Sequence, residues 1–288
     1  MQLTGARALI TGAGGGIGRA IAAELVRQGV QVLLVDRDAR ALEAATAELA
    51  SARTLSAQHV ADLSVAAERE KLCDVARTWR GGVNILINNA GLNPFGLFED
   101  LKPEQIDLAL AVNLQAPMHL CRELLPHLRR QAPAAIVNTG SVFGAIGFPG
   151  YVAYSTTKFA LRGFSEALRR ELAGSGVAVQ YLAPRATRTP INSSTVETMN
   201  RELGVAMDPP ARVADELVAL LRSGRTSAVV GWPEKVFVKV NALLPAIVDR
   251  ALRKQLPIIQ RYARASQPAH APSLAPAPVT VEVRRHAT

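Results

Sequence analysis

A tyrosine and a lysine stand one helical turn apart in the segment Tyr154-Ser155-Thr156-Thr157-Lys158. Residues at positions i and i+4 share a helix face, so this phenol and this ammonium can interact. A free phenol, with a pKa of about 10, is a poor base near neutral pH. A neighbouring ammonium stabilises the phenolate and lowers that pKa, which makes Tyr154 a candidate general acid/base.

Two polar residues precede this pair in the chain. Ser141 lies 13 residues before Tyr154, at the end of an expected strand, and Asn113 lies inside a helical segment. A serine hydroxyl can hydrogen-bond a substrate oxygen and hold it for attack. Taken singly, Tyr154 could be a core residue, Lys158 a solvated helix residue and Ser141 a strand-end cap. Their joint spacing favours a catalytic group.

A glycine-rich loop follows the first expected strand and opens the first expected helix. It reads Thr11-Gly12-Ala13-Gly14-Gly15-Gly16-Ile17-Gly18. Glycines allow a pyrophosphate to approach the backbone closely, and the helix N-terminus offers free N–H groups and a positive dipole end. A flexible turn is the plain alternative. The position between a strand and an amphipathic helix favours a dinucleotide site.

Two acidic residues end the next two expected strands. Asp36 follows Gly18 by 18 residues, where a carboxylate can accept hydrogen bonds from both ribose hydroxyls of an adenosine. It would repel a 2′-phosphate, so we favour NAD as the cofactor. NADP stays open, because the guanidinium of Arg37 could pair with that phosphate. Asp62 is placed to hydrogen-bond the adenine amino group.

The elements that must position these residues alternate along the chain. Apolar runs predict strands at residues 7–11, 30–36, 56–62, 83–88, 134–139, 177–182 and 227–230. Amphipathic segments predict helices that include residues 17–28, 39–52 and 65–80. Several runs are apolar almost throughout, which suits parallel strands covered on both faces. The alternation predicts a single α/β domain with a Rossmann-like, doubly wound parallel sheet.

The chain resembles the short-chain dehydrogenase/reductase family over residues 3–231. The motifs that carry the resemblance are the glycine loop, Asn88-Asn89-Ala90-Gly91, Ser141, and Tyr154 with Lys158. The resemblance implies an NAD(P)-dependent oxidoreductase that interconverts a secondary alcohol and a ketone. It implies that Lys158 also binds the nicotinamide ribose, and that Asn113 kinks its helix and holds a water in a proton relay. It implies no metal. The cofactor-binding residues expected are Gly12, Gly14, Gly15, Gly16, Ile17, Gly18, Asp36, Arg37, Asp62, Leu63, Asn89, Ala90, Gly91, Tyr154, Lys158, Pro184 and Thr189.

One position departs from the family pattern. Pro184-Arg185 stands where the family usually has Pro-Gly, which brings a large cation to the nicotinamide end of the cleft. Its side chain either points away or contacts the cofactor diphosphate or an acidic substrate. Thr189 matches the family threonine at the nicotinamide carboxamide or phosphate, although it could be an N-cap before Pro190. Residues 186–210 form a polar, mobile segment with a short helix, and 190–207 would be the substrate lid.

The segment 234–264 has no counterpart in the family core. Its apolar residues recur at helical spacing, seven basic residues dominate the remainder, and Pro245 and Pro257 divide it. Three interpretations stay open: a helix packed on the core or on a partner subunit, an interfacial membrane helix, and a cover over the substrate cleft. Residues 265–288 hold four prolines and predict a disordered tail after a catalytic domain over 1–233.

Apolar residues near the expected cleft favour a hydrophobic, lipid-like or acyl substrate, although all of them could be core. They are Phe95, Phe98, Val142, Phe143, Ile146 and Phe148. The alternatives are a small polar alcohol or sugar, with the extension used for oligomerisation, and a non-catalytic cofactor-binding scaffold.

The composition limits the partners. Of the net charge of +9, residues 234–288 carry +6, which disfavours nucleic acid as a partner of the core. Two cysteines, Cys73 and Cys121, exclude a disulfide scaffold. No apolar run reaches transmembrane length, and the first residues do not resemble a secretory signal. We expect a cytoplasmic homo-oligomer, a dimer or tetramer, with peripheral membrane contact through 234–264 left open.

Overall fold

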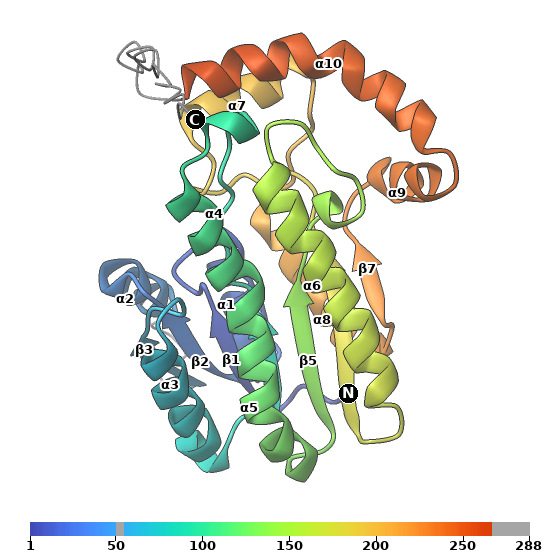
Figure 1. Ribbon diagram of the computed structural model, residues 1–288. Helices are drawn as coiled ribbons and strands as arrows, with labels where there is room; N and C mark the ends of the chain where they lie inside the picture. Colours follow the sequence, from blue (N-terminus) through green and yellow to red (C-terminus); the bar gives the residue numbers. More distant parts are fainter. Residues whose placement is uncertain (50–54, 267–288) are drawn as a thin grey trace, which may run out of the picture.

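The fold is built on one seven-stranded sheet in the order β3-β2-β1-β4-β5-β6-β7, and all neighbouring strands run parallel (Figure 1). The computed structural model describes residues 1–49 and 55–266. The strands are β1 (Arg7–Thr11), β2 (Gln31–Asp36), β3 (Ser56–Val60), β4 (Ile85–Asn88), β5 (Ala134–Thr139), β6 (Val177–Ala183) and β7 (Ser227–Val229).

Helices alternate with the strands along the chain. They are α1 (Gly16–Arg27), α2 (Ala39–Glu48), α3 (Ala66–Thr78), α4 (Pro103–Leu110), α5 (Ala116–Arg130), α6 (Val152–Glu171), α7 (Ser194–Glu202), α8 (Pro210–Ser223), α9 (Glu234–Leu243) and α10 (Pro245–Ala265). The predicted doubly wound α/β fold is confirmed. The helix predicted over 39–52 ends at Glu48, and part of the prediction lies outside the described residues.

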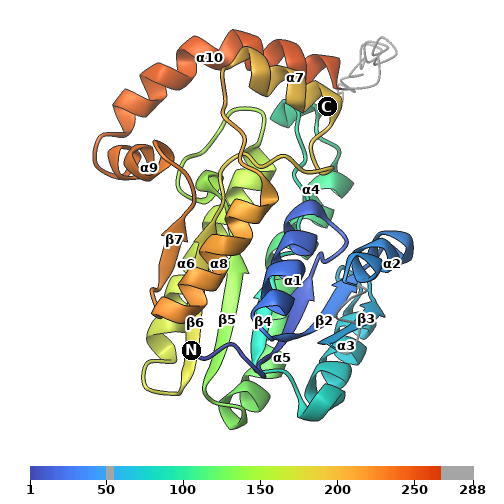
Figure 2. The ribbon, with the colours of Figure 1, turned by 180° about the vertical axis from the view of Figure 1, so that it is seen from behind.

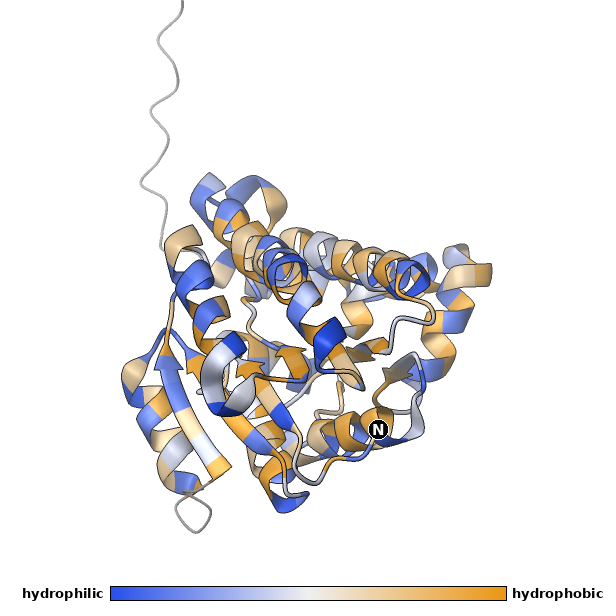
Figure 3. Cartoon of the chain, turned by 90° about the horizontal axis from the view of Figure 1, so that it is seen from below, coloured by the Kyte–Doolittle hydropathy of each residue, from blue (hydrophilic) through white to orange (hydrophobic). Residues whose placement is uncertain are grey.

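Two apolar cores lie on opposite faces of the sheet. Ile10 belongs to the core under α1 and α8, whereas its neighbour Leu9 belongs to the core under α3 and α5 (Figures 1 and 2). Adjacent strand residues point to opposite faces, so a strand covered on both sides must be apolar at every position. Figure 3 shows these apolar central strands between the helices.

The carboxyl ends of the parallel strands meet at one edge of the sheet. β1 pairs with β2 on one side and with β4 on the other, so the chain leaves β1 in one direction and later returns on its other side. Such a switch point opens a crevice where open α/β sheets bind ligands. The segments that follow β1 to β6 carry the residues singled out from the sequence.

The extension forms a helical hairpin beyond this edge, beside α7 (Figures 1 and 2). Pro245 occupies the first turn of α10, so the expected break there is found. The expected break at Pro257 is wrong, because α10 continues through it. Burial of Val248 before the proline and Ile259 after it stabilises both halves against the lost hydrogen bond.

The described ranges contain no helix long and apolar enough to cross a membrane. The tail predicted from residue 265 lies outside the described residues from 267 onward.

Candidate active site

The glycine loop turns sharply between β1 and α1. Gly12 has a φ of +66°, and a Cβ there would lie 2.7 Å from the Cα of Ala90. Only glycine allows the loop to pass so close to the segment after β4. Gly15 precedes α1 with no side-chain cap, so the first turn of the helix presents its backbone N–H groups to the cleft.

The Asn-Asn-Ala-Gly segment braces that loop. Thr11 Oγ1 accepts hydrogen bonds from the backbone N–H groups of Asn89 at 2.9 Å and Ala90 at 3.0 Å. The Asn89 amide donates to the backbone oxygen of Thr11 at 3.1 Å. On the other side, Asn88 donates to Asn138 Oδ1 at 2.8 Å and so joins β4 to β5. The Asn-Asn-Ala-Gly segment therefore holds the carboxyl end of β4 against the ends of β1 and β5.

Asp36 and Asp62 lie on the wall of the same cleft as the glycine loop. Asp36 Oδ2 accepts a hydrogen bond from the backbone N–H of Gly14 at 2.9 Å, so its carboxylate is held beside the loop. Arg37 also lines the cleft. Asp62 accepts from the hydroxyl and the backbone N–H of Ser64, and these bonds hold its pKa below the ordinary value.

Ser141, Tyr154 and Lys158 meet at the carboxyl end of β5. Ser141 precedes a 3-10 turn over Val142–Gly144, and its Oγ accepts from the backbone N–H of Phe143 at 3.1 Å. α6 brings Tyr154 within hydrogen-bonding reach of the Ser141 side chain. Lys158 Nζ lies 5.6 Å from the centre of the Tyr154 ring and donates to the Thr139 backbone oxygen at 2.9 Å.

Burial dominates the titration of this pair. It raises the pKa of Tyr154, and the hydrogen bond with Ser141 acts in the opposite direction. It lowers the pKa of Lys158 from 10.5 to about 8. The lowering of the Tyr154 pKa expected from Lys158 and a positive nicotinamide together stays a prediction, since burial dominates in the protein alone. Desolvation disfavours both charges, and Lys158 directs its ammonium to a backbone carbonyl.

Asn113 lies in a π-helical turn over Ala111–Gln115, between α4 and α5. It is fully buried and does not line the cleft. Its side chain accepts from the Leu92 backbone N–H at 2.7 Å, donates to the Leu92 oxygen at 2.8 Å, and donates to Thr157 Oγ1 at 3.1 Å. Asn113 thereby ties the loop after β4 to the helix that carries Tyr154.

Sequence reasoning missed Tyr181 on β6. Its buried hydroxyl receives a hydrogen bond from the Ser141 backbone N–H at 3.4 Å and donates to the Lys158 backbone oxygen at 3.4 Å. The ring lies close to Gly140 and Gly144, where a Cβ would overlap it. Tyr181 thus contacts the backbone at both Ser141 and Lys158. In the sequence it resembles any core residue of a strand, so no signal singles it out.

A cleft of about 910 Å³ connects these parts. All the residues predicted to bind the cofactor line it, together with Ser141. Its far end is walled by the extension, which contributes Glu234, Phe237, Val240, Ile247, Val248, Ala251, Leu252 and Gln255. The extension therefore both packs on the core and covers the cleft, which were two of its three interpretations.

Arg185 lines the cleft and is held in an ion-pair network. It forms two hydrogen bonds with the Asp208 carboxylate, at 2.7 and 2.8 Å, and contacts Glu234 at 3.1 Å. Gly231, with a φ of +102°, leaves room for the arginine, because a Cβ there would lie 2.8 Å from Arg185 Nε. Arg185, two residues after the end of β6, thus joins the segment before α8 to the start of α9.

Thr189 lies over the glycine loop, where a Cβ on Gly16 would come within 2.8 Å of its methyl group. It caps no helix, because α7 begins at Ser194 with Ser193 as its N-cap.

A hydrogen bond joins α7 to the extension. The Tyr262 hydroxyl on α10 donates to the Glu202 carboxylate on α7 at 2.8 Å.

The predicted apolar residues divide between the cleft and its surroundings. Val142, Phe143, Ile146 and Phe148 line the cleft. Phe95 and Phe98 do not: Phe95 packs on the Tyr151 ring at 4.9 Å, and Phe98 is exposed in a short 3-10 turn. Tyr151, which the sequence did not single out, lines the cleft and lies 6.2 Å from the Tyr154 ring centre.

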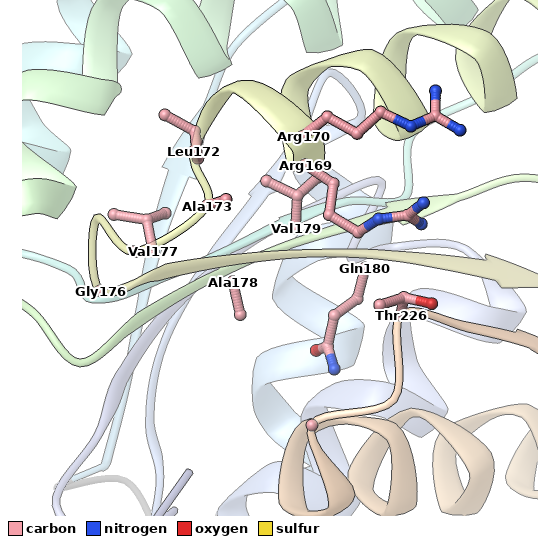
Figure 4. Close-up of a pocket in the computed structure, with 12 residues that line it drawn as sticks. Arg169, Arg170, Leu172, Ala173, Gly176, Val177, Ala178, Val179, Gln180 and Thr226 are labelled. Carbon is pink, nitrogen blue, oxygen red and sulfur yellow. The ribbon is translucent and has the colours of Figure 1, made fainter.

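A second hollow of about 600 Å³ lies at the opposite, amino end of β6 (Figure 4). Arg169, Arg170 and Thr226 lie along it, and none of the predicted site residues does. Within residues 1–49 and 55–266, no group of three or more His, Cys, Asp and Glu side chains could hold a metal ion.

Comparison with known proteins agrees with this arrangement. Residues 6–200 match the short chain dehydrogenase family. The chain belongs to that family. It is accordingly an oxidoreductase that acts on CH–OH groups with NAD or NADP.

Two relatives and one solved structure illustrate the similarity. Nodulation protein G of Rhizobium sp. (strain N33) is 36% identical over 80% of this chain and 94% of its own. D-beta-hydroxybutyrate dehydrogenase of Cupriavidus necator is 32% identical over 73% and 82%. A short chain dehydrogenase/reductase from Burkholderia phymatum in complex with NAD superposes with a TM-score of 0.77 at 26% identity, covering 84% of this chain and 94% of its own.

The residues present fit a dinucleotide. The close approach of the loop at Gly12 leaves its backbone open to a pyrophosphate, and the uncapped N-terminus of α1 supplies donors and a positive dipole end. The carboxylate of Asp36, on the wall of the same cleft, is an acceptor of the kind that ribose hydroxyls need. In this short-chain dehydrogenase, Ser141, Tyr154 and Lys158 line the same cleft as these groups.

Proposed function

We propose that this chain catalyses hydride transfer between a hydrophobic secondary alcohol or ketone and NAD. One observation carries the proposal: a single cleft is lined by the glycine loop, by Ser141, Tyr154 and Lys158, and by apolar side chains of the extension. When bound, the nicotinamide accepts or delivers the hydride.

Each residue of the group has a distinct role in this proposal. Tyr154 gives its proton to the carbonyl oxygen during reduction and takes it back during oxidation. The Ser141 hydroxyl hydrogen-bonds the same oxygen and fixes its distance from Tyr154. Lys158 supplies positive charge beside the phenol and binds the nicotinamide ribose. Asn113 positions α6 against the loop after β4 and, with a bound water, relays protons to Lys158.

Asp36 supports NAD as the preferred cofactor. Its carboxylate is held beside the glycine loop by Gly14, so a 2′-phosphate there would meet a fixed negative charge. The neighbouring Arg37 is the group that NADP would use. One solved structure, from Burkholderia phymatum, is in complex with NAD and another, from Burkholderia cenocepacia, is in complex with NADP, so the proposed preference rests on Asp36.

The wall formed by the extension supports the hydrophobic substrate class. Six of its lining side chains are apolar: Phe237, Val240, Ile247, Val248, Ala251 and Leu252. The opposite wall adds Val142, Ile146 and Phe148. An alkyl or acyl chain would replace water along these surfaces and gain about 25 cal/mol for each Å² buried.

The test is steady-state turnover at the absorbance of reduced nicotinamide, with ketones of increasing alkyl length. We expect kcat/KM to rise with chain length and NADH to be preferred over NADPH. Tyr154→Phe should lower kcat by at least about a hundredfold with cofactor affinity unchanged. Tyr262→Phe, a matched loss of a hydroxyl outside the cleft, should leave kcat unchanged. Near-normal turnover in Tyr154→Phe would contradict the mechanism.

A small polar substrate is the second candidate. The relative from Cupriavidus necator is named for D-beta-hydroxybutyrate, a short hydroxy acid, and that name favours it. In the same assay, a preference for short hydroxy acids or polyols over long ketones would select this candidate. Cofactor binding with no turnover of any compound would instead support a non-catalytic scaffold.

We also propose that the chain is a homo-oligomer. Met118 on α5 and Val152 and Phe159 on α6 are exposed apolar residues on neighbouring helices (Figure 1). Light scattering after size-exclusion chromatography should give a dimer or tetramer mass. Phe159→Ser should shift that mass toward the monomer.

A further inference from the structure

The turn between α9 and α10 is an exposed apolar segment. Residues 242–247, which read Ala-Leu-Leu-Pro-Ala-Ile, are all exposed, and we call them the apolar turn. Leu243 is 80% exposed, Leu244 57% and Ile247 56%. The rest of the hairpin is anchored, because Asn241 donates to the Ala145 backbone oxygen at 2.8 Å and Val248 is buried. The fold therefore holds these side chains in water on a fixed support.

Exposed cations flank the apolar turn on both helices. They are Lys235 and Lys239 on α9 and Arg250, Arg253 and Lys254 on α10. None of the five forms an ion pair with a described residue. Two acids share these helices: Glu234 is paired with Arg185, which leaves Asp249 beside five unpaired cations. The hairpin is thus apolar at its turn and positive along its sides.

The apolar turn also adjoins the substrate end of the cleft. Ile247 belongs to the turn and lines the cleft, and Val248 and Ala251 continue the cleft wall along α10. An apolar molecule that reaches the turn would therefore contact an apolar surface leading toward Tyr154. This continuity sets the turn apart from exposed apolar residues elsewhere, such as Val60 on β3.

We propose that the apolar turn docks on an anionic lipid surface, with Leu243, Leu244 and Ile247 at the acyl boundary and the flanking cations at the headgroups. A two-fold contact between two copies would bring the same unpaired cations together, which is unfavourable. A turn of six residues is small against the roughly 1,000 Å² that a specific protein interface needs. Docking of the apolar turn on lipid is independent of the proposed hydride transfer. Delivery of a hydrophobic substrate from the lipid to the cleft would rest on that proposed function.

The experiment is co-sedimentation of the full chain with phosphatidylcholine vesicles, with and without phosphatidylglycerol, and without substrate or cofactor. Two variants test the two parts of the surface: Leu243→Ser with Leu244→Ser, and Arg250→Gln with Arg253→Gln. Their matched controls are Val60→Ser with Val65→Ser, and Arg129→Gln with Arg130→Gln. All keep residues 267–288, so the contribution of those residues is constant.

We expect binding to vesicles that contain phosphatidylglycerol, weakened when salt rises from about 0.1 M to about 0.5 M. The arginine variant should bind about thirtyfold more weakly, since it loses two headgroup-facing cations that each contribute about 1 kcal/mol. The leucine variant should bind at least about tenfold more weakly, because two apolar side chains no longer enter the acyl boundary. The controls should bind as the parent does, and turnover of a water-dispersed ketone should be the same in all. Equal and negligible sedimentation on both lipids would overturn the proposal. So would a loss of oligomer mass in the leucine variant with vesicle binding unchanged.

Discussion

Replacing Arg185 tests whether the buried ion-pair network holds the extension in place. Arg185→Met keeps an unbranched stem and removes the guanidinium, and with it both bonds to Asp208 and the contact with Glu234. The side chain of Arg185 is 11% exposed and that of Asp208 is 4% exposed, so water replaces the lost partner poorly. Breaking a buried pair from one side typically costs about 3–5 kcal/mol.

We expect a cost near the lower end of that range, about 3 kcal/mol, because Arg212 stays 3.4 Å from Asp208. For a domain of this size, that corresponds to a melting temperature about 5 °C lower. Urea unfolding followed by circular dichroism measures the change. Arg212→Met is the matched control: it removes an arginine that is 53% exposed from the same carboxylate and should cost no more than about 1 kcal/mol.

The pH dependence gives the same test a second readout. Hydrogen bonds from Arg185 hold the pKa of Asp208 below its ordinary 3.8. A depressed carboxyl pKa stabilises the fold at pH above the unfolded value, and this contribution is lost as pH falls through the folded value. Arg185→Met should therefore unfold with a weaker dependence on acid below about pH 4. Equal losses in the Arg185 and Arg212 variants, with an unchanged acid dependence, would refute the buried-network reasoning.

Three other perturbations follow from the site. Asp36→Asn keeps an acceptor for the Gly14 N–H but removes the charge, so the ratio of kcat/KM with NADPH to that with NADH should rise at least about tenfold. Reduction should slow as pH rises through about 8, the pKa to which burial lowers Lys158, because Lys158 then loses the positive charge that it supplies beside the Tyr154 phenol; Lys158→Met should remove this step from the pH profile. Gly231→Ala should lower stability by at least about 1 kcal/mol, since its φ is +102° and the new methyl would press on Arg185, and thermal unfolding measures this.

The strands and the glycine loop could be predicted because their signals are local. A strand covered on both faces needs an unbroken apolar run, and β1 was placed at its observed bounds from that pattern alone. Strand ends among polar residues were less certain: the strand predicted to reach residue 62 ends at Val60. The loop after β1 needs a positive φ at Gly12, and a glycine at that position indicates this directly.

The neighbours of Arg185 could not be predicted. Asp208 and Glu234 lie 23 and 49 residues further along the chain, and no periodic pattern links them. The Tyr154 pKa could not be predicted either, because its direction depends on burial, which the spacing to Lys158 does not report. The course of α10 through Pro257 depends on the packing of Ile259, which is likewise non-local.

The wall supplied by α9 and α10 has a consequence for the order in which the enzyme is completed. Translation proceeds from the N-terminus, and protein segments can fold as they emerge. The loop after β1, Ser141 after β5 and Tyr154 on α6 all precede the hairpin, which is made afterwards. A nascent chain can therefore assemble its nucleotide crevice while the substrate end is still open. Under the proposed function, selectivity for the substrate is acquired last, from a segment separate from the groups that transfer the proton.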